Sequence, residues 1–147
     1  MKFYLNTFKF PTVKVKITNE DDEDNKSFHK VINKWWKFYK KKRHFHFIFD
    51  FTELNHCNVN LIPMFVKNQM ELKKQETHYL DYSIVVLNNK LLINILTKLL
   101  NMITPIGVIY ITNSLDNSNT LVNYLNSPFT SSQFIETFLL VQNITKI

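Results

Sequence analysis

Three short runs of apolar residues, each followed by a helical pattern, constrain the fold of this chain more than any other feature. The runs cover 45–51, 82–87 and 106–111, and each has apolar residues on both faces of the expected strand. A strand of this kind is buried on both of its faces, which is typical of a parallel sheet packed between helices. The rhythm of the sequence therefore predicts an α/β protein.

Helical periodicity accounts for the segments between and after these runs. Apolar residues recur three and four positions apart over 26–41, 61–75, 90–103, 115–126 and 132–142. Asn60 can cap the second helix, whose inward residues are expected to be Leu61, Ile62, Phe65, Val66, Met70 and Leu72. The clearest stripe, in the third helix, consists of Leu91/Leu92, Ile95/Leu96, Leu99/Leu100 and Met102/Ile103. A terminal strand is the alternative interpretation of 132–142.

The N-terminal residues show a different pattern, in which apolar and polar residues alternate. We expect two strands, over 2–8 and 10–18, that pair antiparallel at one edge of the sheet with one face exposed to water. The acidic segment 19–25 then forms a loop before the first helix, where carboxylates favour the positive end of the helix dipole. Together these patterns predict a single α/β domain over 1–147. Its mostly parallel or mixed sheet has helices on both faces and antiparallel edge strands on its N-terminal side.

The chain has one glycine, Gly107, and no alanine. Phosphate-binding loops of nucleotide enzymes need several glycines, because their backbone approaches the phosphates closely. The composition therefore excludes a Walker loop and a dinucleotide-binding fingerprint. The abundance of Lys, Asn, Ile and Phe, which have AT-rich codons, indicates an AT-rich genome such as that of a large DNA virus or a microbe.

Much of the formal net charge of +6 lies in one basic cluster that follows two tryptophans. The acidic run 20–24 opposes it in the sequence. Basic residues beside aromatic ones favour an anionic partner. Specific contacts to phosphates and bases, however, are made largely by Arg, and the chain has only one Arg. Nucleic-acid or anionic-surface binding is therefore an alternative function, through the cluster Lys37, Lys40, Lys41, Lys42 and Arg43.

Catalytic and metal-binding motifs are absent from the sequence. Cys57 is the only cysteine, so no internal disulfide can form, and a reducing, cytoplasmic location is expected. His44, His46 and His56 lack the spacing of a metal motif, and a nucleophile rarely has its base as its sequence neighbour. We expect no catalytic residue, metal or cofactor. We also expect no signal peptide and no membrane span, because no apolar stretch is long enough.

One part of the chain has the layout of a known domain. A strand ending in Ile48–Leu54 is followed by a loop, a helix from about Asn60, and a second strand–helix unit, Ile84–Leu87 and Leu91–Ile103. This segment, Phe47–Ser114, resembles the STAS (anti-sigma-factor antagonist-like) domain. Lipid-binding CRAL-TRIO-like domains have a similar topology but are longer and carry a gating helix that this chain lacks.

The resemblance extends to part of the STAS switch motif. Asp50 and Thr52 match the end of the family's strand, an apolar-Asp-apolar-Ser pattern. The family's loop then reads Asp-Ser-Ser/Thr-Gly, and the residues at that place here are Asn58, Val59, Asn60 and Leu61. The phosphorylatable residue is therefore missing. The resemblance implies a binding or scaffold domain that is not switched by phosphorylation at this site.

We therefore expect a non-enzymatic STAS-like interaction or scaffold module that binds a protein partner, with a homo-oligomer as a further form of association. The expected contact residues are Thr52, Glu53, Asn58, Asn60, Trp35 and Trp36. An enzyme would instead need a pocket with convergent polar groups at the carboxyl ends of the strands. The polar residues expected at that edge are Asp50, Thr52, Glu53, Asn88, Asn89, Thr112, Asn113 and Ser114.

Overall fold

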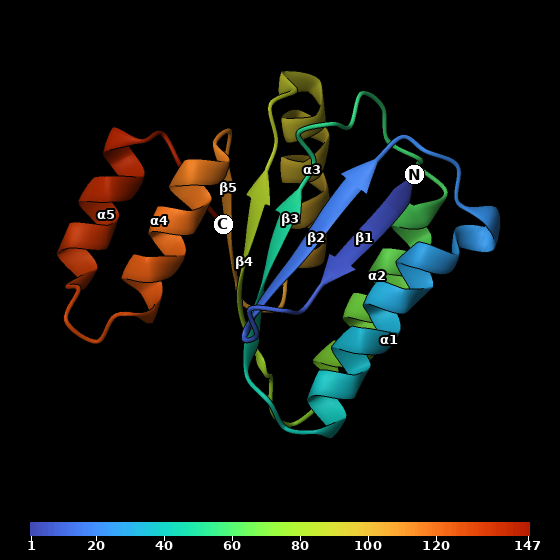
Figure 1. Ribbon diagram of the computed structural model, residues 1–147, viewed down its shortest axis with the longest axis horizontal. Helices are drawn as coiled ribbons and strands as arrows, with labels where there is room; N and C mark the ends of the chain where they lie inside the picture. The colour runs from blue at the N-terminus through green and yellow to red at the C-terminus, as the bar shows by residue number, and fades with distance from the viewer.

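The computed structural model describes all residues 1–147, most of which lie in five α-helices and one six-stranded sheet (Figure 1). The strands are β1 (Lys2–Asn6), β2 (Thr12–Thr18), β3 (Phe45–Asp50), β4 (Leu80–Val86), β5 (Val108–Thr112) and β6 (Thr145–Lys146). The helices are α1 (Lys26–Lys40), α2 (Leu61–Lys73), α3 (Lys90–Ile103), α4 (Leu115–Asn126) and α5 (Ser132–Val141), and a 3-10 turn, η1 (Glu23–Asn25), precedes α1.

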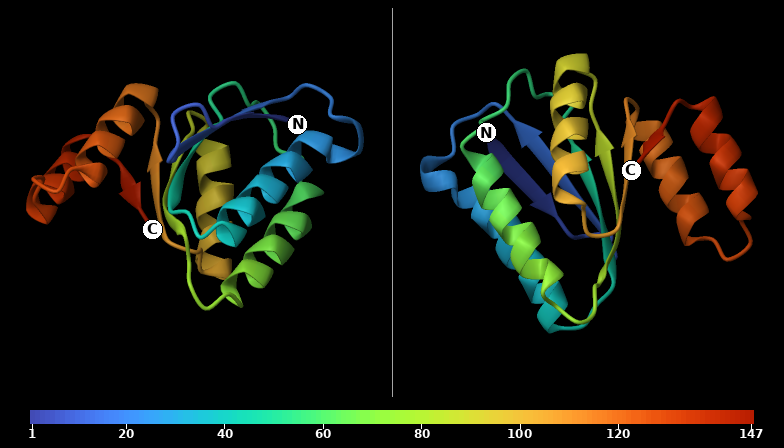
Figure 2. Two further views of the ribbon diagram at one scale, coloured as in Figure 1. Left: turned by 60° about the horizontal axis from the view of Figure 1, so that its bottom comes forward. Right: turned by 180° about the vertical axis from the view of Figure 1, so that it is seen from behind.

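The six strands form one mixed sheet whose spatial order, β1-β2-β3-β4-β5-β6, follows the chain. Strands β2 to β5 are parallel, whereas β1 and β6 pair antiparallel at the two edges. Because every parallel connection steps in the same direction and such connections are right-handed, α1, α2 and α3 lie on one face (Figure 2). Helices α4 and α5 pack on the other face. The predicted α/β sheet, with helices on both faces and an antiparallel N-terminal edge, is confirmed.

The face under α1 holds a core built mainly of aromatic rings. Trp35 meets the rings of Phe45 and Phe47 edge-on, with centroids 6.5 and 5.0 Å apart. The ring of Phe38 lies 4.7 Å from that of Phe45. All four side chains are buried, and rings of this size remove more apolar area from water than any other side chains. Helix α1 is therefore firmly anchored to β3.

Helices α4 and α5 cover only part of the opposite face. Leu121 and Leu139 pack there with Ile84 and Val86 of β4, and all four are buried. The same face of β1 and β2 has no helix over it, and Tyr4 is 42% exposed there. This arrangement explains the alternating sequence of the N-terminal strands, whose inward residues meet α1 while their outward residues meet water.

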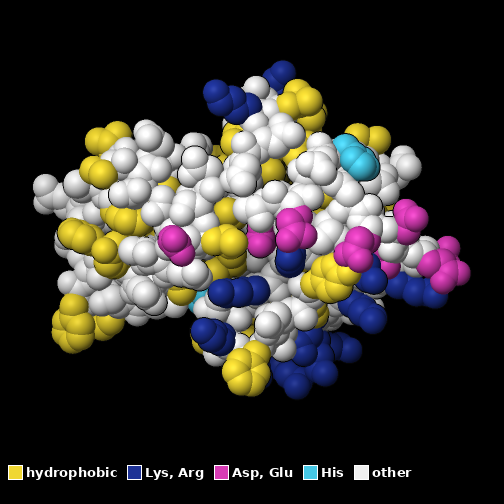
Figure 3. Space-filling model, turned by 45° about the horizontal axis from the view of Figure 1, so that its top comes forward, with side chains coloured by type: hydrophobic (Ala, Val, Ile, Leu, Met, Phe, Trp, Pro, Cys, Tyr) yellow, Lys and Arg dark blue, Asp and Glu magenta, His cyan; other side chains and the backbone are white.

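Charge is unevenly distributed over the surface. In Figure 3 the charged side chains gather over the N-terminal part of the molecule, whereas the end formed by α4 and α5 is mainly neutral or apolar. Within 113–144 the only charged residues are Asp116 and Glu136. Apart from Lys146, all the other charged residues lie within 1–98.

The final helix predicted over 132–142 is present as α5, so the alternative of a strand over those residues is wrong. Beyond the helix, Asn143 adopts a left-handed backbone with φ of 52° and the chain turns back into β6. Ile147 exchanges two backbone hydrogen bonds with Ile109, at 2.8 and 3.0 Å, beside β6. A strand of two residues is too short to show a periodic pattern, so periodicity could not reveal β6.

The single glycine lies where the chain enters β5. Gly107 has φ of +73°, and a Cβ at this position would lie 3.1 Å from the carbonyl oxygen of Leu80. A side chain would be both strained by the backbone conformation and crowded by β4. Glycine is therefore required here for a close approach of two strands.

Candidate functional site

A cavity of about 180 Å³, partly open to solvent, lies between α1, α2, α3 and the sheet. Twenty-three residues line it, and 19 of them are hydrophobic. They come from residues 1 to 109, because β1, α1, β3, α2, β4, α3 and β5 each contribute to the wall. Protein interiors are otherwise packed nearly as densely as organic crystals. A void of this size beneath three helices is therefore the main departure from a filled core.

The cavity exists because α2 and α3 bury few residues against the sheet. The buried residues of α2 are Leu61, Asn68, Gln69 and Leu72, and those of α3 are Leu92 and Leu100. Two of these six side chains are amides, which fill an apolar contact less completely than Leu or Phe. Both helices therefore stand over the sheet with space beneath them.

Two expectations about these helices are wrong in detail. Met70, expected to point inward, is 61% exposed, and Gln69 is buried instead. Helical geometry gives the reason, since positions 65, 69 and 72 share one face and position 70 lies about 100° away from 69. In α3 the paired apolar stripe is wider than the surface it covers, so Leu91 and Met102 remain 66% and 83% exposed.

Gln69 is the buried polar side chain in this region that lacks hydrogen-bond partners. It is 3% exposed, lines the cavity and makes no hydrogen bond, so its Nε2 is a buried donor without a partner. Buried polar groups in proteins are nearly always hydrogen-bonded, and leaving one unpaired costs about 1–3 kcal/mol. A donor without a protein partner at the wall of an apolar cavity is therefore exceptional.

Side-chain hydrogen bonds hold α2 to its neighbours at two points only. Trp36 donates from Nε1 to Oδ1 of Asn68 at 2.8 Å, which joins α1 to α2 and leaves Nδ2 of Asn68 unpaired. Lys73 donates from Nζ to the carbonyl oxygen of Ile103 at 2.6 Å, which joins α2 to the end of α3. With so few polar ties, α2 can adjust its position over the cavity.

Cys57 and Asn58 bring the loop between β3 and α2 into the cavity wall. The backbone N–H of Asn58 contacts the Met1 sulfur at 2.9 Å, and its side-chain oxygen accepts from the backbone N–H of Asn60 at 3.1 Å. Burial raises the pKa of the Cys57 thiol, so this cysteine stays protonated and is a poor nucleophile. Asn60, expected to cap α2, is exposed and makes no capping bond.

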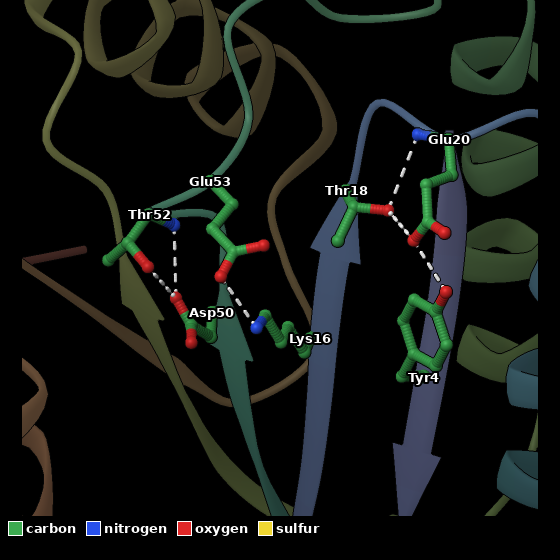
Figure 4. Close-up of polar contacts among 7 residues, drawn as sticks. All are labelled: Tyr4, Lys16, Thr18, Glu20, Asp50, Thr52 and Glu53. Atoms are coloured by element: carbon green, nitrogen blue, oxygen red, sulfur yellow. Dashed lines mark hydrogen bonds and ion pairs between the residues drawn. The ribbon is translucent and has the colours of Figure 1, made fainter.

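The carboxyl ends of the parallel strands carry a second polar group of residues (Figure 4). Asp50 accepts hydrogen bonds at one carboxylate oxygen from the backbone N–H and the hydroxyl of Thr52, at 3.0 and 2.6 Å. Glu53 forms an exposed ion pair with Lys16 at 2.6 Å. These contacts shape the turn after β3, and each group in them already has a partner.

The edge strand β1 carries the remaining contacts of Figure 4. Glu20 accepts hydrogen bonds from the hydroxyls of Tyr4 and Thr18, and these bonds hold the pKa of its carboxyl below the usual value. The hydrogen bond to Glu20 likewise raises the pKa of Tyr4. Because the donors and acceptors satisfy one another, these hydrogen bonds serve to connect β1 to the loop after β2.

The two tryptophans expected to contact a partner occupy different environments. Trp35 is 3% exposed and belongs to the aromatic core. Trp36 is partly buried and directed toward α2 through its bond to Asn68. Trp35 is thus a wall of the cavity in the free chain, and the role of both residues in partner binding stays a prediction.

The basic cluster lies at the end of the molecule opposite to Asp50 and Glu53, because it leads from the end of α1 into the start of β3. Its side chains are all exposed and none forms an ion pair. Arg43 lies over the ring of Phe10, with 4.0 Å between the guanidinium carbon and the ring centroid. The cluster is Lys37, Lys40, Lys41, Lys42 and Arg43.

The histidines have separate partners. His44 bonds to Asp81 at 2.7 Å, whereas His46 is buried, bonds to the Thr12 hydroxyl at 2.7 Å and has its pKa lowered by burial. The structure brings no three His, Cys, Asp or Glu side chains together in a way that could hold a metal ion. It also contains no helix with the length and apolar character of a membrane span.

Comparison of the chain with protein-family models, curated proteins and solved structures found no match. The resemblance to STAS therefore rests on the residues quoted above and stays a prediction. The cavity was not foreseen from the sequence, although one signal was present: the successive amides Asn68 and Gln69 interrupt an otherwise apolar inward face.

Proposed function

We propose that this protein binds a small apolar molecule in the cavity beneath α1, α2 and α3. The observation that carries the proposal is a partly open cavity of about 180 Å³ whose lining is almost entirely hydrophobic. A dry apolar cavity of about 150 Å³ is known to accept benzene. By that comparison the cavity holds about seven non-hydrogen atoms, and because it is partly open the end of a longer chain can extend toward solvent.

Binding of this kind is favoured by two effects. Apolar ligand surface that leaves water contributes about 25 cal/mol per Å². The cavity wall, which lacks partner atoms on one side, gains dispersion contacts when a ligand fills the space. A preformed apolar pocket of few polar groups is the usual form of a small-molecule site in proteins.

The test measures the binding of toluene and nonane to the chain. Calorimetry and the fluorescence of Trp35, which lines the cavity, are the two readouts. Leu96→Trp on α3 and Ile62→Trp on α2 each place a large ring in the lining. We expect both variants to lose binding and to unfold at the same or a higher temperature than the parent chain.

Leu91→Trp is the matched control, because Leu91 lies on the same helix as Leu96 and is 66% exposed. It adds the same ring outside the cavity and should leave binding unchanged. Binding that survives both cavity-filling variants, or an unmodified chain that binds neither hydrocarbon, would contradict the proposal.

The protein-interaction role predicted from the sequence can be connected to the same site. What supports the connection is that one loop supplies both the expected contacts and part of the lining, Phe51, Cys57 and Asn58. We propose that a partner contacts this loop at Thr52, Glu53, Asn58 and Asn60, and that filling the cavity alters the loop. Slower amide hydrogen exchange over 51–60 on addition of nonane would support this, and unchanged exchange would argue against it.

An anionic partner at the basic cluster is the second candidate. The observation that favours it is that five exposed cationic side chains at one end of the molecule have no acidic partner. We expect weak binding of random-sequence DNA that falls steeply between 50 and 200 mM salt. Changing Lys40, Lys41 and Lys42 together to Glu should abolish it, whereas Lys90→Glu with Lys98→Glu on α3 should not. Salt-independent binding would exclude this candidate.

A further inference from the structure

If the proposed function holds, the polar groups of the cavity indicate which apolar molecules it binds. Nε2 of Gln69, in the lining, is a hydrogen-bond donor buried without a protein partner. In an apolar wall such a donor is satisfied by water or by an acceptor that the bound molecule brings. A pure hydrocarbon that displaces the water would leave this donor unpaired.

The charge of the ligand follows from what the lining lacks. No Lys, Arg, His, Asp or Glu side chain is among the residues that line the cavity. A carboxylate or an ammonium group placed beside Gln69 would therefore lose its hydration without gaining a counter-charge, which is far more costly than burying a neutral carbonyl.

One charged group near the lining is the α-amino group of Met1, and its position separates it from Gln69. It acts on Cys57, in the loop that precedes α2. Gln69 lies eight residues beyond Leu61, the first residue of α2. At about 1.5 Å per residue this amounts to about 12 Å along the helix. An acid bound at the Met1 end would not use Gln69, and this difference can be measured.

We infer that the cavity selects uncharged apolar molecules that carry a single carbonyl-type acceptor, such as ketones, aldehydes, esters or primary amides, and that Gln69 is the residue that selects them. The amide donates to the carbonyl oxygen while the lining covers the hydrocarbon part.

The experiment compares three ligands of nearly equal size, 2-octanone, nonane and octanoate, with the full chain at pH 7. Isothermal titration calorimetry gives the three dissociation constants. On binding, 2-octanone loses the hydration of its carbonyl and regains one hydrogen bond to Gln69. We therefore expect the affinity of 2-octanone relative to that of nonane to be about five- to tenfold higher in the parent chain than in a chain without this donor, and this excess is the preference for 2-octanone. Octanoate should bind more weakly than both.

Gln69→Met is the decisive variant, because Met has a similar length and flexibility but no donor. It should remove the preference for 2-octanone while nonane binds as before or more tightly. Gln75→Met, at an exposed position just beyond α2, is the matched control and should retain the parent preference. The unfolding temperature of each variant shows whether the chain remains folded.

The outcomes separate the two proposals. If nonane and 2-octanone bind equally, and Gln69→Met changes neither, the cavity is a binding site but the selection by Gln69 is wrong. If octanoate binds most tightly and independently of Gln69, the ligand is an acid held at the Met1 end and the inference is overturned. If none of the three ligands binds, the proposed function fails and the inference fails with it.

Discussion

Helices α1 and α2 cross the same face of the sheet and differ little in length, yet they pack in opposite ways. The buried residues of α1 are Ser27, Phe28, Val31, Trp35, Phe38 and Tyr39, whereas those of α2 are Leu61, Asn68, Gln69 and Leu72. Both helices line the cavity, but α1 also seals an aromatic core against β3, whereas α2 has no comparable packed side. Two adjacent crossover helices can therefore differ in how much they stabilise the sheet while bordering the same cavity.

The buried polar groups show the same contrast. Ser27 on α1 accepts from the backbone N–H of Phe3 at 2.8 Å and donates to the carboxylate of Asp22 at 2.5 Å. Gln69 on α2 makes no hydrogen bond and Asn68 makes one, with Trp36. The hydroxyl that α1 buries thus contributes to folding, whereas the Gln69 amide on α2 makes no hydrogen bond that would do so.

The largest expected effect is the loss of stability when an aromatic residue is removed from the core under α1, compared with one removed from α2 at the cavity wall. Phe47→Ala should lower the free energy of unfolding by about 3–5 kcal/mol, because a fully buried ring is lost and its space cannot collapse. Phe65→Ala, on the cavity wall, should lower it by less than about 1.5 kcal/mol, because its ring is partly exposed and already borders a void. Denaturant unfolding at pH 7 measures both, and equal losses would contradict the contrast.

Substitutions of the buried polar residues should change the stability less, and in opposite directions on the two helices. Ser27→Ala should destabilise the chain by about 1–3 kcal/mol, since it leaves the hydrogen-bond partners of the Ser27 hydroxyl unpaired. Gln69→Met should stabilise the ligand-free chain by up to about 1 kcal/mol, because it removes a buried amide that has no partner. The same unfolding assay applies. A loss of stability in Gln69→Met would mean that Gln69 has a folding role and that α2 resembles α1 after all.

Most of the fold could be predicted from the sequence, because it depends on local periodicity. The bounds expected for 90–103 and 115–126 are those of α3 and α4, since each begins after a capping side chain, Asn89 or Ser114. Pro105 and Pro128 close the two segments. Element type is set by the residues within the element, and such information survives in a single sequence.

The cavity could not be predicted, because it depends on the height of α2 above the sheet. That height results from contacts between residues far apart in the chain, such as Trp36 with Asn68 and Lys73 with Ile103. Periodicity shows which side of a helix points inward but not how closely it packs. Of the residues expected to point inward in α2, only Met70 is exposed, because its apolar character does not change its position on the outer side of the helix.

The smallest expected effect is a dependence on pH that only the α1 side shows. The hydrogen bond from the Ser27 hydroxyl, opposed by partial burial and supported by backbone N–H groups, holds the pKa of Asp22 below its usual value of 3.8. A carboxyl whose pKa is lower in the folded chain than in the unfolded chain stabilises the fold above the unfolded pKa, and this contribution is lost as the pH falls through the folded pKa.

The stability difference between the parent chain and Ser27→Ala should therefore be constant above about pH 5 and shrink progressively from there toward pH 3. The difference between the parent chain and Gln69→Met should stay constant over the same range, because no ionisable side chain lines the wall beside Gln69. Denaturant midpoints at pH 6, 5, 4 and 3 measure both differences. If the Ser27→Ala difference does not change with pH, the Asp22 carboxylate does not anchor α1, and the contrast between the two helices is then one of apolar packing alone.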